Sequence, residues 1–250
     1  MFTATVARYG RRVAIEVQRT DRVDRFTYQQ LYDLAVAHGV WLTANGVQPG
    51  DRCAILAHND AHWCAVYLGI LRAGATAVPL DTNYTAKQVG TIVRDSGARL
   101  LFVSERLRPV VAQALADGLI DAQIDIADVH TFPGTATALS AEAKPEPNAP
   151  AVILYTSGTT SDPKGVVLTH ANLLAERDAA FQVVKLLIGE AIDTVGPLHF
   201  DRHALAESRN SAGEHRPDGL RGQGLDSTCS SLFDGGQPAD LQVGNRSLHR

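Results

Sequence analysis

The feature that most constrains the fold of this chain is the alternation of short apolar runs with amphipathic segments along its first 200 residues. The runs at 52–57, 75–80 and 99–104 have few polar interruptions, and segments with apolar residues at helical spacing lie between them. Continuously apolar strands separated by helices are typical of parallel pairing in which both faces of the sheet are covered. We therefore predict an α/β fold with a doubly wound parallel sheet and right-handed crossovers.

Local signals set the expected ends of the individual elements. We expect a strand at 13–17, a helix ending at Asn45-Gly46, a helix that begins at the N-cap Asn59, and a further helix opened by Thr85. The later expectations are a helix at 108–118, strands at 123–132, 151–156 and 165–169, a helix capped by Thr169, and a strand that starts near 193–195.

Composition separates the chain into two parts. We expect residues 1–200 to form the α/β domain, with 133–150 as a surface connection rich in Ala, Pro and Thr. Residues 201–250 contain a single β-branched aliphatic residue, Val243, and no helical or strand period, so we expect a poorly ordered or disordered tail. The abrupt change also suggests the hypothesis that this tail is an out-of-frame or truncated stretch.

Bulk properties exclude several classes of function. The chain has 250 residues, 45% hydrophobic residues and a net charge of -4, which gives no general electrostatic reason to bind nucleic acid. Its three cysteines are too few and too scattered for a disulfide framework. No apolar run approaches the roughly 20 residues of a membrane helix. We therefore expect a cytoplasmic protein without a transmembrane segment, and the sequence leaves its oligomeric state open.

The stretch YTSGTTSDPKG, residues 155–165, concentrates the groups that a phosphate chain requires. Hydroxyl side chains supply donors, Lys164 supplies a flexible cation, and Gly158 and Gly165 are expected to permit backbone geometries closed to other residues. It is not a Walker A loop, because Pro163 precedes the lysine and the segment that follows favours a strand. From donor density alone, a Ser/Thr/Gly-rich hairpin without a ligand remains an alternative.

The same stretch resembles the phosphate-binding motif of the AMP-forming adenylating enzymes, the superfamily of acyl-CoA synthetases, luciferases and peptide-synthetase adenylation domains. Residues 46–104 are similar to the first half of the large domain of that family, so the resemblance covers about residues 1–200. It implies that this region is the N-terminal part of an AMP-binding domain.

The resemblance implies two-step chemistry, in which a carboxylic acid reacts with ATP to give an acyl-adenylate and the acyl group then passes to a thiol. It implies ATP, Mg²⁺ and coenzyme A as cofactors or co-substrates, and a small carboxylic acid as substrate, with a fatty acid favoured. Carried over by position, the residues that would hold the β- and γ-phosphates are Thr156, Ser157, Gly158, Thr159, Thr160 and Lys164.

The sequence departs from the family pattern in several places. Ser161 stands where many members have glycine, and the segment at 196–205, with His199 and His203, is similar to a family segment in altered order. The sequence contains no Thr-Glu dipeptide, no Thr-Gly-Asp tripeptide and no lysine after Lys185. By resemblance, the metal, ribose and transition-state contacts of the family then have no counterpart. We therefore expect this chain alone to be catalytically incomplete.

Three functional alternatives stay open at this point. The first is an acyl-CoA synthetase, the second a non-catalytic remnant that at most binds nucleotide or a partner, and the third a luciferase-like or peptide-synthetase adenylation domain. His58 and His62 have the i,i+4 spacing that could suggest a metal site on a helix. Because no third ligand lies near them in sequence, we favour a structural role for both histidines. We likewise expect Trp63, Tyr67 and Leu71 to be core residues, and Cys64 to be buried and inert.

Overall fold

The computed structural model describes residues 2–126, 145–156, 164–188 and 198–201. These residues all belong to the first of two compact units, Met1–Arg209. The predicted tail at 201–250 lies outside the described residues except for Asp201, and the predicted connection at 133–150 is described only from residue 145.

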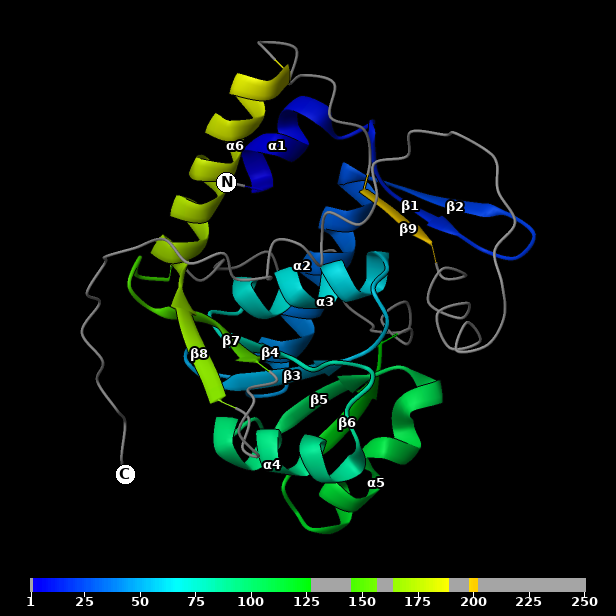
Figure 1. Cartoon of the computed structure of the whole chain (residues 1–250), viewed down its shortest axis with the longest axis vertical. Helices are drawn as coiled ribbons and strands as arrows, with labels where there is room; N and C mark the ends of the chain where they lie inside the picture. The colour runs from blue at the N-terminus through cyan, green and yellow to red at the C-terminus, as the bar shows by residue number, and fades with distance from the viewer. Residues whose placement is uncertain (1, 127–144, 157–163, 189–197, 202–250) are drawn as a thin grey trace, which may run out of the picture. The chain divides into compact units, whose positions relative to one another are not determined.

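The main sheet has six strands in the order β6-β5-β3-β4-β7-β8 (Figure 1). Their bounds are β3 Arg52–Leu56, β4 Thr76–Pro79, β5 Leu100–Val103, β6 Ala122–Asp125, β7 Pro150–Thr156 and β8 Lys164–Thr169. The pairs from β6 to β7 are all parallel, whereas β8 pairs antiparallel with β7. The predicted doubly wound α/β fold is confirmed, with the addition of one antiparallel edge strand.

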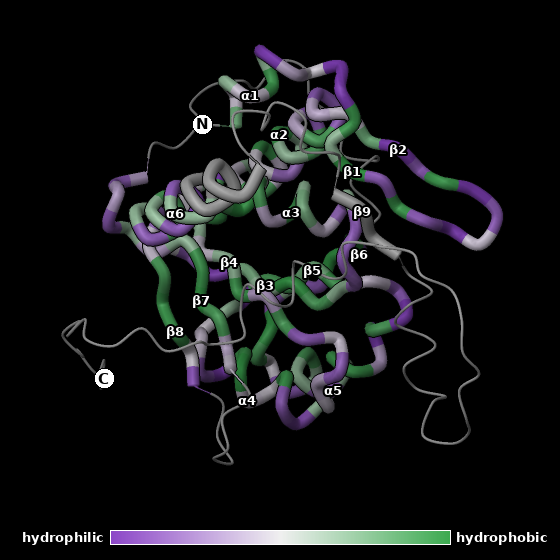
Figure 2. The backbone as a smooth tube through the Cα atoms, turned by 45° about the horizontal axis from the view of Figure 1, so that its top comes forward, coloured by the Kyte–Doolittle hydropathy of each residue, from purple (hydrophilic) through white to green (hydrophobic). Residues whose placement is uncertain are grey.

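Helices cover both faces of this sheet, because the strands carry apolar side chains on both faces. One core packs strand residues such as Leu101 against α4 (Ala86–Ser96) and α5 (Arg108–Ala116), which follows the short helix η1 (Glu105–Leu107). The other core packs Phe102 and its neighbours against α2 (Tyr28–Ala44) and α3 (Ala61–Arg72). The apolar character of these strands is visible along the backbone in Figure 2.

A second, smaller sheet was not predicted. It has the order β2-β1-β9 and consists of β1 Val13–Gln18, β2 Val23–Thr27 and β9 Leu198–Asp201. Buried residues of β1 pack against α2 and α3, so these two helices lie between the two sheets. A further helix, α1 (Phe2–Tyr9), precedes β1 and contributes Phe2 to the same cluster. The strand predicted at 13–17 therefore exists, but it belongs to this second sheet.

Side-chain caps explain where several helices begin. Thr27 and Thr85 each form a capping box with the glutamine three residues later, and the prediction that Thr85 opens a helix is confirmed. The predicted N-cap Asn59 is wrong: Asp60 has the extended backbone of a cap, and its Oδ1 accepts a hydrogen bond of 3.0 Å from the Trp63 amide. Both residue types are good caps, so sequence alone could not choose between neighbours.

The region after the main sheet begins with a helix. The amide of Asn172 donates to Thr169 Oγ1 over 3.2 Å, which confirms Thr169 as the cap of α6 (His170–Ile188). The strand predicted at 123–132 is shorter, because β6 ends at Asp125, and residues 127–132 lie outside the described part. The strand predicted to start near 193–195 also begins outside the described residues. Within the described residues, no helix combines the length and apolarity needed to cross a membrane.

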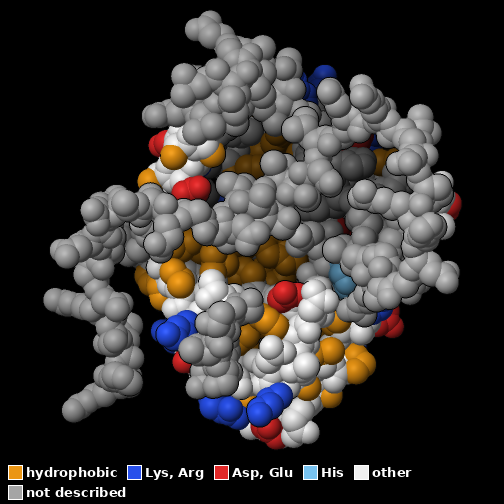
Figure 3. All heavy atoms as spheres, viewed as in Figure 1, with side chains coloured by type: hydrophobic (Ala, Val, Ile, Leu, Met, Phe, Trp, Pro, Cys, Tyr) orange, Lys and Arg blue, Asp and Glu red, His pale blue; other side chains and the backbone are white. Residues whose placement is uncertain are grey.

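The edge strand β8 leaves apolar side chains in contact with solvent. Val166 and Val167 are 47% and 48% exposed, and Leu174 of α6 is 41% exposed. Hydrophobic side chains gather over β7 and β8 in the space-filling view of Figure 3. Successive residues of a strand point to opposite faces, so β8 is incompletely covered on both.

Candidate functional site

The predicted phosphate-binding stretch begins at the end of β7 and ends at the start of β8. These strands form an antiparallel hairpin whose last pair is Thr156 with Lys164. The predicted site residues Ser157, Gly158, Thr159 and Thr160, and also Ser161, lie outside the described residues. Thr156 and Lys164, the two described members of the predicted set, are thus brought together as cross-strand neighbours.

Pairing rules place the two side chains on the same face of the hairpin. Residues directly opposite each other in an antiparallel pair point to the same side, with Cβ atoms about 4.5–5.5 Å apart. Thr156 and Lys164 are both exposed. Because β7 runs parallel to β4, Thr156 lies at the carboxyl edge of the parallel strands, where ligands bind in open α/β sheets.

Gly165 has a different role from the one expected. It is not among the glycines with positive φ, so the hairpin needs no special backbone geometry there. A Cβ at Gly165 would instead lie 3.0 Å from Ile153 Cγ2 and 3.0 Å from Tyr155 Cζ. Glycine leaves room at this position for two side chains of β7 that lie directly against the backbone of β8, and a Cβ there would force these side chains to shift.

Tyr155 connects the hairpin to the rest of the domain. Its hydroxyl donates a hydrogen bond of 2.6 Å to Asp95 Oδ2 in the last turn of α4. The Tyr84 hydroxyl in turn donates a hydrogen bond of 3.4 Å to the carbonyl oxygen of Tyr155. Burial, followed by the hydrogen bond to Asp95, holds the pKa of Tyr155 far above its ordinary value. The phenol is therefore a hydrogen-bond donor at any physiological pH.

Sequence reasoning missed this contact. Tyr155 stands inside the quoted stretch, but it carries no local sign of its partner. Asp95 is an ordinary exposed helix residue 60 positions earlier in the chain. Only co-variation of the two positions could have revealed the pair.

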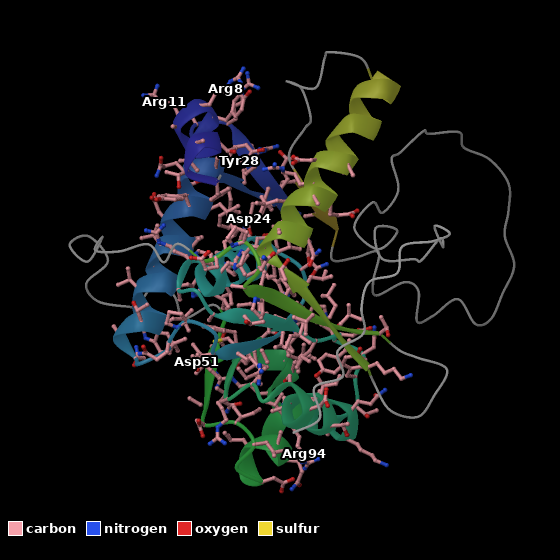
Figure 4. All side chains as sticks on the ribbon, turned by 90° about the vertical axis from the view of Figure 1, so that its left-hand side faces the viewer. Arg8, Arg11, Asp24, Tyr28, Asp51 and Arg94 are labelled. Carbon is pink, nitrogen blue, oxygen red and sulfur yellow. The ribbon has the colours of Figure 1, made fainter. Side chains whose placement is uncertain are left out.

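A separate cavity of about 460 Å³ lies at the opposite edge of the main sheet. It is lined by the first residues of three parallel strands, Arg52, Leu100 and Ala122, and by Asp51, which is labelled in Figure 4. Its lining contains neither Thr156 nor Lys164. Since parallel sheets bind ligands at the carboxyl ends of their strands, we do not assign this cavity to the predicted chemistry.

The remaining candidate residues have structural positions. Within the described ranges, no three His, Cys, Asp or Glu side chains are grouped so as to hold a metal ion. His62 packs edge-on against Phe26 with ring centroids 5.9 Å apart, as expected of a structural histidine. Trp63 and Tyr67 stack on each other and pack on the core, as predicted, whereas Cys64 is only partly buried.

Comparison with known proteins identifies the group to which these features belong. The model of the AMP-binding enzyme family matches residues 2–203. The fatty acid–[acyl-carrier-protein] ligase ScoC of Streptomyces coeruleorubidus is 38% identical over 159 residues, which are 61% of this chain and 30% of that protein. The long-chain-fatty-acid–CoA ligase FadD13 of Mycobacterium tuberculosis is 35% identical over 155 residues, 60% of this chain and 30% of that protein.

Solved structures agree with the sequence relatives. The inhibitor-bound N-terminal domain of FACL13 from Mycobacterium tuberculosis superimposes with a TM-score of 0.63 and 30% identity, over 72% of this chain and 46% of that one. The matched region of this chain thus spans about 30% of the length of both ligases named above.

Proposed function

This chain belongs to the AMP-binding enzyme family, and from that premise we propose that it serves the ATP-dependent activation of a carboxylic acid as an acyl-adenylate. The names of the relatives favour a fatty acid as the substrate class. They also support two thiol acceptors, coenzyme A and an acyl carrier protein. Of the two, coenzyme A is the acceptor we propose, which makes the activity that of an acyl-CoA synthetase.

The observation that carries this proposal is the pairing of Thr156 with Lys164 at the carboxyl edge of the sheet. In the proposed reaction, a carboxylate oxygen attacks the α-phosphorus of ATP, the bond to the bridging oxygen breaks, and pyrophosphate leaves. Negative charge grows on the leaving group, so a cation and hydroxyl donors held in place stabilise the transition state. Lys164 would supply that charge and Thr156 one of the hydroxyls.

The other proposed contacts to the β- and γ-phosphates come from the residues between the strands. They are Ser157, Gly158, Thr159 and Thr160. Bound Mg²⁺ would neutralise further phosphate charge, but no described residue is assigned to hold it. A cytoplasmic location, where ATP and coenzyme A are available, forms part of the same proposal.

A binding titration tests the role of Lys164 directly. We expect Lys164→Ala in the full chain to weaken ATP binding, because a hydrogen bond to a charged group contributes about 1.5–3 kcal/mol, or about 10-fold to 150-fold in the dissociation constant. Lys87→Ala is the matched control, since Lys87 is an exposed lysine in the first turn of α4 and not part of the hairpin. Equal affinities of the parent and Lys164→Ala would contradict the assigned role.

A second candidate function is nucleotide binding without turnover. It is favoured by the sequence itself, which contains no Thr-Glu dipeptide, no Thr-Gly-Asp tripeptide and no lysine after Lys185. The two candidates differ in pyrophosphate release from ATP in the presence of a panel of carboxylic acids. Turnover by this chain alone would exclude the second candidate, whereas ATP binding without pyrophosphate release would support it.

A further inference from the structure

Tyr155 and Gly165 form the pair next to Thr156 and Lys164 in the hairpin. Neighbouring residues of a strand point to opposite faces, so the tyrosine ring lies on the face opposite to the proposed phosphate-binding side chains. The ring is close enough to β8 that a Cβ at Gly165 would lie 3.0 Å from its Cζ and 3.1 Å from its Oη. It therefore supports the backbone of β8 one residue away from Lys164.

The same ring is anchored outside the hairpin. Its hydroxyl donates to Asp95 over 2.6 Å, and the two residues are 60 positions apart. The Tyr84 hydroxyl, just before α4, reaches the Tyr155 carbonyl oxygen at 3.4 Å. Contacts from both ends of α4 thus converge on one residue of β7.

The anchor helix is itself held firmly. A capping box closes the start of α4, and Gly97 ends it in the left-handed conformation with φ 67°. Val89, Ile92 and Val93 are buried in the core beneath it. Arg94, which precedes Asp95 in this helix, is labelled in Figure 4. A hydrogen bond from Tyr155 to this helix consequently ties the hairpin to a rigid part of the domain.

We propose that Tyr155 is a positioning residue: through Asp95 and Gly165 it fixes where the end of β7 and the start of β8 lie, and so fixes Thr156 and Lys164 relative to a bound nucleotide. β8 is the edge strand of the sheet, and within the described residues β7 is the strand with which it pairs. An edge strand of a hairpin is free to shift and twist at its end. The inference rests on the proposed function only for its effect on nucleotide affinity.

The experiment uses the full chain and three variants, Tyr155→Phe, Asp95→Ala and the double variant, with ATP as the probe. If Tyr155 acts through Asp95, all three lose about the same affinity, roughly fivefold to tenfold, because the second change removes nothing further. Asp95→Asn retains an acceptor oxygen and should restore most of the affinity. Tyr67→Phe is the control, as Tyr67 is a partly buried tyrosine of α3 packed on the other core.

Amide hydrogen exchange supplies a readout that does not depend on nucleotide. The hydrogen-bonded backbone amides of residues 154–156 and 164–166 should exchange about tenfold faster in Tyr155→Phe than in the parent. Their exchange rates should not change in Tyr67→Phe. If the parent does not bind ATP, the proposed function fails and exchange alone decides the positioning role. Unchanged exchange in Tyr155→Phe, or additive affinity losses from Tyr155→Phe and Asp95→Ala, would overturn the inference.

Discussion

Two glycine-to-alanine substitutions, one at a crowded position and one at an open position, are expected to change the stability of the domain in opposite directions. Gly69 lies in α3 where this helix crosses α2, and a Cβ there would lie 2.4 Å from His38 Cβ and 3.0 Å from the Ala35 carbonyl oxygen. His38 is fully buried and packs edge-on against Phe102 with ring centroids 5.6 Å apart, so it has no room to retreat. We expect Gly69→Ala to destabilise the domain.

The magnitude follows from two opposing effects. Overpacking a well-filled interior costs about 1–3 kcal/mol, and the upper end applies because backbone atoms of α2 would have to move. Replacing glycine by alanine inside a helix returns about 1 kcal/mol. The net loss is therefore about 2 kcal/mol, or about 4–8 °C in melting temperature for a domain of this size.

Gly90 provides the matched control. It lies inside α4, where a Cβ would meet nothing within 4 Å, so Gly90→Ala should stabilise the domain by about 0.5–1 kcal/mol. Urea unfolding followed by circular dichroism measures both variants against the parent. The reasoning fails if Gly69→Ala is as stable as the parent, or if Gly90→Ala loses as much stability as Gly69→Ala.

Two further outcomes are expected. Thr85→Ala should lower the free energy of unfolding by about 1 kcal/mol, since it removes the capping box with Gln88; an unchanged urea midpoint would refute this. Burial, with a smaller effect of Asp51, raises the pKa of Cys53 from 9.0 to about 12. Between pH 9 and pH 12 the thiol ionises in the unfolded chain but stays neutral in the folded chain, which favours unfolding. The free energy of unfolding should therefore be unaffected by this group below pH 9 and fall by about 1.4 kcal/mol at pH 10. Urea titrations at pH 8 and 10 should show a smaller loss in Cys53→Ala; equal losses in both proteins would contradict this.

Much of the main sheet could be predicted because its signals are local. The apolar runs of β3, β4 and β5 and the caps Thr85 and Thr169 each act within a few residues, and the structure confirms them. The motif at 155–165 likewise indicated the family without any knowledge of the fold, and the family model agrees over residues 2–203. The assignment of phosphate contacts to the loop residues stays a prediction.

The sequence could not supply what depends on contacts between distant segments. Nothing local in Val13–Gln18 indicates that β1 leaves the main sheet to pair with β9, whose residue Leu198 lies opposite Ile15. The alternation pattern of a strand specifies which face is buried and not which partner buries it.

The hairpin shows the same division between local and distant information. By itself, the sequence determined that two strands flank a segment rich in hydroxyl groups and carrying a lysine. The tertiary structure decided that Gly165 accommodates the ring of Tyr155 and that this ring reaches Asp95 on α4. The physical reason is that hydrogen-bond capping and hydrophobic periodicity are encoded within a few residues, whereas close packing arises only when separate elements meet.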